Sequence, residues 1–351
     1  MKQTVKICNT ANFEDSLRSI ASANLVVLMA PSAVFEQCVG KMKDMIPNVP
    51  NIGVCGQGYY QLSDHPEDVM LIGFYECETI VDVISDVERP ISSVEKLMEN
   101  VAQIKGSSNN TVCLDFATGN DSVIVTTFNA CLNEKGIDLV GATAWDNKVS
   151  CNGVVYNNAC VYALIKNLNG SIRTYKENIY CIDETMPTFI ATKIDEAAQK
   201  IISLDNRSAA SVYQNTLHIK ESDIVSQTFQ NPIGKIYGKD ICIISIKEVA
   251  GDALVCYRQV NDSDVLVLLE LLDYKQVAKE TVQMIKKDFS HISGVFAVNC
   301  ILRYLLFVQN HNVDDYLSIM GGLNNFAGFV GNGEHFNGQF VNQSMVCAVF
   351  E

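Results

Sequence analysis

The same pattern occurs three times along this sequence, and that repetition limits the possible folds more than any other feature. Each copy begins with an apolar run, continues through a helical stretch, reaches a glycine turn after about 30 residues and ends in a second apolar run. The first runs begin at Leu25, Val112 and Val295. The glycine turns begin at Gly53, Gly141 and Gly328. The pattern predicts three related units of strand, helix and strand in one chain.

The apolar runs also predict the fold class. Because they lack polar alternation, they are typical of strands buried on both faces. We therefore expect an α/β protein of layered domains, with mixed β-sheets covered by helices and with room for a hairpin after each glycine turn. The chain has 351 residues, about twice the length of a common domain. Its long apolar runs stop between Glu177 and Pro187, so we expect two domains, residues 1–182 and 183–351.

Composition and charge narrow the classes of partner. Hydrophobic residues make up 48% of the chain, which excludes a disordered protein. The net charge of −14 and the absence of a basic run argue against nucleic acid and against an anionic membrane surface. No apolar run reaches the ~18 residues that span a bilayer, and none precedes Glu14 as a secretory signal would. The sequence predicts a cytoplasmic protein. Its 13 cysteines are dispersed without a C-x-x-C pair, which indicates buried thiols.

Arg303 is the most informative single residue, because it interrupts a long apolar run. We expect it at the end of a central strand, where an unpaired guanidinium group would be costly. Its partner is either a carboxylate of the protein, such as Glu334, or the carboxylate of a small ligand. The sequence leaves both open.

A dense polar segment follows the third glycine turn and extends the candidate site. Loop polarity alone usually means solvation, but the repeat places this segment opposite the end of the Arg303 strand. Arg258 poses the same question on a predicted alternating strand, where facing water is the simpler explanation. The candidate ligand-binding residues are Arg303, Asn299, Cys300, Gly331, Gly333, Glu334, His335, Asn342 and Arg258.

Patterns typical of catalysis or metal binding are weak. The five histidines show no ligand spacing, so no metal site is predicted. There is no G-x-S-x-G elbow and no Walker A string, and we expect a protein that is not an enzyme. One alternative stays open: an amidase-like enzyme whose thiol nucleophile, Cys55 or Cys300, acts beside His335.

The segment Asn325–Phe350 resembles the closing signature of the FIST family of sensory proteins. Further likeness lies in Ser293–Cys300 with Arg303, in Cys256–Asn261, in Phe229–Gly234 and in Lys135–Ala144. The resemblance covers almost the entire chain, so it assigns residues 1–182 to a FIST N-terminal domain and residues 183–351 to a FIST C-terminal domain. One departure is that Phe340 stands where the family usually has a histidine, while His335 lies five places earlier.

The resemblance implies a bacterial intracellular sensory module for signal transduction. Such modules are commonly joined to chemoreceptor-type, histidine-kinase or cyclic-dinucleotide output domains, and amino acids or organic acids are ligands proposed for the family. We therefore expect a chain without a cofactor that binds a small metabolite and passes a conformational change to an output domain or partner. Some relatives are haem-dependent nitric-oxide sensors. This gives a second hypothesis, with haem as cofactor and an axial His or Cys, for which His335 is the first candidate. A homodimer is compatible with the low charge content, 19%.

Overall fold

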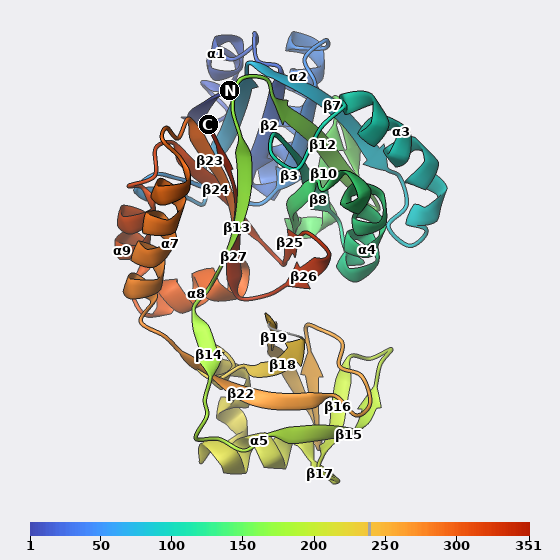
Figure 1. The fold of residues 1–351 in the computed structure, drawn as a ribbon, viewed down its shortest axis with the longest axis vertical. Helices are drawn as coiled ribbons and strands as arrows, with labels where there is room; N and C mark the ends of the chain where they lie inside the picture. The colour runs from blue at the N-terminus through green and yellow to red at the C-terminus, as the bar shows by residue number, and fades with distance from the viewer. Residues whose placement is uncertain (238–239) are drawn as a thin grey trace. The chain divides into compact units, whose positions relative to one another are not determined.

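The computed structural model describes the whole chain except residues 238–239 (Figure 1). By packing, the chain divides into two compact units. Unit 1 comprises Met1–Glu177 and Ala278–Glu351, and unit 2 comprises Asn178–Val277. The chain therefore leaves unit 1 after Glu177 and returns to it within the helix α7, Tyr274–Asp288. These units differ from two consecutive domains, because unit 2 is inserted between the two chain segments of unit 1. The boundary at 182/183 stays a prediction about where the family modules meet.

Unit 1, which is described throughout, contains three six-stranded sheets. The first has the order β1-β6-β2-β3-β10-β11. Its strands are β1 (Lys2–Cys8), β6 (Val69–Tyr75), β2 (Leu25–Ala30), β3 (Asn51–Cys55), β10 (Val149–Cys151) and β11 (Val154–Tyr156). The helices α1 (Phe13–Ser19) and α2 (Ser32–Met45) pack on it through a shared apolar cluster.

The second sheet has the order β26-β25-β9-β8-β12-β7. Its strands are β26 (Gln339–Val341), β25 (Glu334–Phe336), β9 (Asp138–Thr143), β8 (Thr111–Ala117), β12 (Cys160–Asn167) and β7 (Cys77–Ile84). The helices α3 (Val94–Ile104) and α4 (Asp121–Leu132) cover its outer face (Figure 1).

The third sheet has the order β13-β27-β23-β24-β4-β5. Its strands are β13 (Ile172–Asn178), β27 (Ser344–Phe350), β23 (Gly294–Cys300), β24 (Phe326–Gly331), β4 (Gln57–Tyr60) and β5 (Ser63–His65). The helices α8 (Ile301–Gln309) and α9 (Val313–Met320) connect β23 to β24.

The three predicted repeats are confirmed by this topology. In each repeat the first strand runs parallel to the second and antiparallel to the last: β2 to β3 and β6, β8 to β9 and β12, β23 to β24 and β27. The hairpin after each glycine turn, however, joins the sheet of another repeat. Hairpin β4–β5 adds to β24, β10–β11 adds to β3, and β25–β26 adds to β9. The exchange is cyclic, so each sheet is completed by a neighbouring repeat.

The inner faces of the three sheets share one apolar core. The ring of Phe116 on β8 lies edge-on to Phe296 on β23 and Phe329 on β24, with centroid separations of 6.2 and 5.9 Å. Val27 from β2 belongs to the same buried cluster. The continuous apolar runs seen in the sequence therefore reflect strands with this core on one face and helices on the other.

Unit 2 has its own sheet and core. Apart from residues 238–239, its sheet has the order β19-β18-β22-β15-β16-β21-β20, with β14 beside β22 and β17 beside β16. The strands are β14 (Tyr180–Ile182), β15 (Phe189–Asp195), β16 (Lys200–Leu204), β17 (Arg207–Ser208), β18 (Ile233–Tyr237), β19 (Asp240–Ile244), β20 (Ile246–Ala250), β21 (Ala253–Cys256) and β22 (Val265–Leu271). The helices α5 (Ala209–Leu217) and α6 (Ile224–Gln227) supply Tyr213 and Ile224 to its core.

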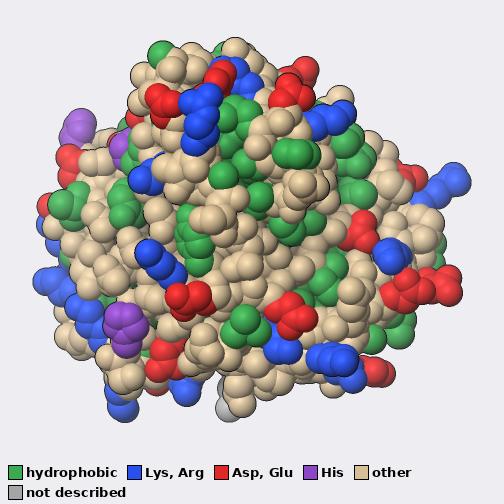
Figure 2. All heavy atoms as spheres, turned by 90° about the horizontal axis from the view of Figure 1, so that it is seen from above, with side chains coloured by type: hydrophobic (Ala, Val, Ile, Leu, Met, Phe, Trp, Pro, Cys, Tyr) green, Lys and Arg blue, Asp and Glu red, His purple; other side chains and the backbone are tan. Residues whose placement is uncertain are grey.

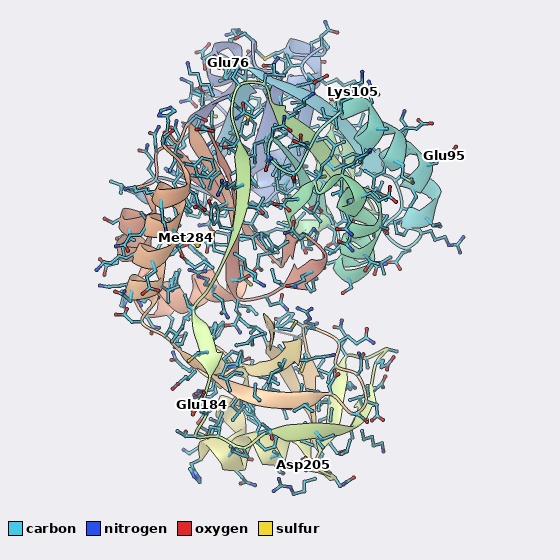
Figure 3. The ribbon with its side chains drawn as sticks, in the orientation of Figure 1. Glu76, Glu95, Lys105, Glu184, Asp205 and Met284 are labelled. Carbon is cyan, nitrogen blue, oxygen red and sulfur yellow. The ribbon has the colours of Figure 1, made fainter. Side chains whose placement is uncertain are left out.

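The surface carries charge of both signs. On the face seen in Figure 2, acidic and basic side chains are interspersed among apolar and polar ones. Labelled charged side chains such as Glu95 and Lys105 project from the outer edge of unit 1 (Figure 3). None of the helices described is both long enough and apolar enough to cross a lipid bilayer.

Candidate functional site

Arg303 lies in the first turn of α8 and not on a strand, which corrects the expectation from sequence. The strand β23 ends at Cys300. Beyond it Arg303, Leu306 and Phe307 are buried at helical spacing, while Leu305 and Val308 are exposed. An apolar run hides this change of period, because buried strands and buried helices are equally hydrophobic.

The guanidinium group of Arg303 is fully buried and paired within unit 1. Its Nη2 forms an ion pair with Oε1 of Glu177, whose side chain is also fully buried. Its Nη1 donates to the backbone oxygen of Glu177 at 3.3 Å. Burial opposes the charge, but Tyr316 and Glu177 outweigh it and raise the pKa of Arg303. The residue is therefore held as a cation in the interior.

Aromatic rings complete the surroundings of this ion pair. The guanidinium carbon lies 5.2 Å from the ring centroid of Phe307 and 4.9 Å from that of Tyr316. The hydroxyl of Tyr316 donates to Oε1 of Glu177 at 3.3 Å. Of the two partners considered from the sequence, a carboxylate of the protein or one of a ligand, the structure has the first. That carboxylate belongs to Glu177 and not to Glu334.

Glu177 and Tyr316 were not among the residues predicted from sequence. A signal for Glu177 exists in β13, where Tyr175 and Glu177 share the buried face of an alternating strand. A carboxylate on such a face needs a buried cation. Tyr316 has no comparable signal, because its spacing on α9 is that of any core aromatic residue.

Glu334 lies at the start of β25, and its side chain is also fully buried. Its Oε1 accepts hydrogen bonds from the backbone nitrogen and the hydroxyl of Ser344, at 3.0 and 2.7 Å. Burial raises the pKa of Glu334 to about 7. Its other oxygen, Oε2, has no hydrogen-bond partner in the described part of the chain. Glu334 is thus a buried carboxyl group held by Ser344, with the Cys300 thiol beside it.

His335, the next residue, belongs to a different cluster on the second sheet. Its Nδ1 lies 2.7 Å from Oδ2 of Asp115, and its Nε2 lies 3.0 Å from Oδ1 of Asp121. Burial lowers the pKa of His335, but the two carboxylates outweigh it and raise the pKa to about 10. Because both ring nitrogens are engaged, His335 does not fit the role of a haem ligand.

The thiols named for the amidase-like alternative are buried. Burial raises the pKa of Cys55, and burial with the nearby Glu334 raises that of Cys300. A thiol nucleophile needs the opposite shift. Among the described cysteines Cys181 is partly exposed and the others are buried, all as free thiols.

The remaining predicted residues serve different purposes. Gly331 ends β24 opposite Cys300, and a Cβ there would lie 2.9 Å from the Cβ of Ala142. A Cβ at Gly333 would lie 2.3 Å from the ring of Phe340, so both glycines permit close packing. Asn342 is buried, and its Nδ2 lacks a hydrogen-bond partner among the described residues. Arg258 belongs to unit 2.

A small cavity of about 10 Å³ is lined in part by Phe307 and Tyr316, the two rings that contact the Arg303 guanidinium group. It has room for about one water molecule. Its walls are Tyr59, Asp64, Asn299, Tyr304, Phe307, Val313, Tyr316 and Leu317. Asn299 is 6% exposed, and in the described chain its Oδ1 has no hydrogen-bond partner. The cavity therefore combines aromatic walls with a buried polar group beside the residues that hold Arg303 and Glu177.

Comparison with known families decides the class of protein. The FIST N domain matches residues 24–207, and the FIST C domain matches residues 209–337. This chain belongs to the FIST family. FIST domains are sensory modules of signal transduction. The resemblance seen in the sequence is thus confirmed. A search of the curated proteins finds no match.

The two FIST segments do not follow the packing of the chain. They meet near residue 208, inside unit 2. Unit 1 therefore contains the beginning of the FIST N segment and the end of the FIST C segment, and the Arg303–Glu177 ion pair links the two.

Proposed function

We propose that this FIST protein is a cytoplasmic sensor that binds a small metabolite with a carboxylate group, such as an amino acid or an organic acid, at Arg303. The Arg303–Glu177 ion pair carries this proposal. A ligand carboxylate has the same charge and geometry as the Glu177 side chain, so it would compete for the guanidinium group. The cavity beside Asn299 and Tyr316 has room for about one water molecule, so the ligand would enter it as the surrounding side chains move apart.

The position of Glu177 supports a route for the signal. Glu177 is the last residue of the first chain segment of unit 1, and β13 ends at Asn178, the first residue of unit 2. A ligand carboxylate that replaces Glu177 as the partner of Arg303 would release the Glu177 side chain, which anchors β13. Occupancy of the site and the state of the connecting strand are thereby coupled, as a ligand-driven shift between two conformations requires. The receiver would be an output domain or partner of the histidine-kinase or chemoreceptor type.

A thermal-shift screen of amino acids and organic acids tests the proposal. A ligand at 100 times its Kd adds about 2.7 kcal/mol to the free energy of unfolding, which raises the Tm by roughly 5 °C. Glu177→Gln removes the internal competitor and is expected to enlarge the shift produced by the same compound.

The control is the double variant Glu177→Gln/Arg303→Met, which keeps the volume but lacks the cation. It should show no shift with the compound that stabilises the wild type. An equal shift in the double variant, or no shift with any compound in the wild type and Glu177→Gln, would refute binding at Arg303.

A further inference from the structure

Tyr304 forms part of the wall of the cavity and is hydrogen-bonded to β4 and β5, two strands of another repeat. Tyr304 follows Arg303 on α8, and its hydroxyl donates to Oδ2 of Asp64 on β5 at 2.5 Å. The same hydroxyl accepts from Nε2 of Gln57 on β4 at 2.9 Å. Burial and the Asp64 carboxylate raise the pKa of Tyr304 to about 12, so the hydroxyl keeps the proton that it donates.

The hydrogen bonds of Tyr304 lie on the side of the cavity that is nearest to solvent. Tyr304, Asp64 and Val313 are the partly exposed wall residues, whereas Tyr59, Asn299, Phe307, Tyr316 and Leu317 are buried. Hairpin β4–β5 is fixed to the third sheet by the pairing of β4 with β24. Its other strand, β5, pairs with β4 in three residue pairs. The Tyr304–Asp64 hydrogen bond is therefore a local closure that can open without separating the sheet.

We infer that Tyr304 and Asp64 form a gate over the cavity, and that opening their hydrogen bond admits small molecules to the buried residues around Arg303. The inference rests on the proposed binding at Arg303 only for its biological purpose, because access to the cavity is measurable without a ligand. Adjacent positions on α8 place the gate residue and the ligand-binding residue on one element.

Cys347 on β27 provides the probe for access. It is fully buried, and burial together with the nearby Glu177 carboxylate raises the pKa of its thiol. Alkylation by iodoacetamide, followed per cysteine by mass spectrometry of the whole chain, reports how often the cavity opens. Tyr304→Phe removes the hydrogen bond at constant shape and is expected to raise the alkylation rate of Cys347 by about tenfold. Asp64→Asn keeps an acceptor but removes its charge and should give a smaller rise.

Two controls separate a gate from general loosening. Cys113 on β8 is equally buried but lies in the second repeat, so its rate should stay unchanged in all variants. Tyr60→Phe removes another hydroxyl of the same hairpin, which donates to Oδ1 of Asn325 at 3.0 Å, and should leave Cys347 within about twofold of wild type. An unchanged Cys347 rate in Tyr304→Phe, or an equal rise at Cys113 or in Tyr60→Phe, would overturn the gate. Neither result depends on whether a carboxylate binds at Arg303.

Discussion

The Arg303–Glu177 ion pair places two opposite charges where water is excluded, and the loss of one leaves the other without compensation. Arg303→Met is therefore expected to lower the free energy of unfolding by about 3–5 kcal/mol, because Glu177 stays buried and unpaired. Adding Glu177→Gln to this variant should restore most of the loss, since an apolar side chain beside a neutral amide is tolerated. Urea unfolding of the wild type, both single variants and the double variant measures the coupling. Additive losses would contradict it.

His335 gives the molecule a predictable dependence on pH. The pKa of His335 is raised to about 10, above the ~6.5 of an unfolded chain, so its stabilising effect is complete below pH 6.5 and is lost as the pH rises through 10. Between pH 7 and 9.5 the wild type should lose on the order of 2 kcal/mol more than His335→Gln.

The comparison with His335→Gln is necessary because burial also raises the pKa values of thiols such as Cys113 and Cys160. Ionisation of these thiols would likewise destabilise the protein as the pH rises. Urea titrations at fixed pH values measure both proteins. Parallel curves for the two would show that Asp115 and Asp121 do not hold a charged histidine.

At the scale of single elements, Gly56 lets the chain turn from β3 into β4, which pairs with β24 of another repeat. Gly56 joins β3 to β4 with φ of +146°, and a Cβ there would lie 2.6 Å from the ring of Phe329. Gly56→Ala is expected to cost about 2–4 kcal/mol, from backbone strain and overpacking together. Gly40→Ala on α2 is the control, because nothing lies within 4 Å of its Cβ position and alanine favours the helix. Chemical denaturation measures both, and equal stabilities of the two variants would contradict this role of Gly56.

The elements also explain what the sequence could and could not predict. Apolar runs beginning at Leu25, Val112 and Val295 identified β2, β8 and β23 to within one residue of their first residues, since burial on both faces leaves a direct mark on composition. The cyclic exchange of hairpins was not predictable, because β4, β10 and β25 carry no local signal for the sheet they join. Arg303 was placed on a strand for a similar reason: hydrophobicity alone does not tell where β23 ends and α8 begins.

For the whole molecule, the exchange makes the three repeats depend on one another. The first sheet needs β10 from the second repeat, the second needs β25 from the third, and the third needs β4 from the first. Residues 1–177 alone would leave the second sheet without β25 and β26 and the third sheet without its three central strands, β27, β23 and β24. Unit 1 should therefore fold only when both of its chain segments are present.

Unit 2, unlike either segment of unit 1, contains all the strands of its own sheet. Its two ends lie side by side, because Tyr180 on β14 pairs with Leu271 on β22, and its core is built from residues 186–268 alone. We expect residues 178–277, expressed separately, to unfold cooperatively on heating, whereas residues 1–177 should show no cooperative transition. Circular dichroism at increasing temperature distinguishes them. A cooperative transition in residues 1–177 would mean that these residues fold without β25, β26 and the three central strands of the third sheet.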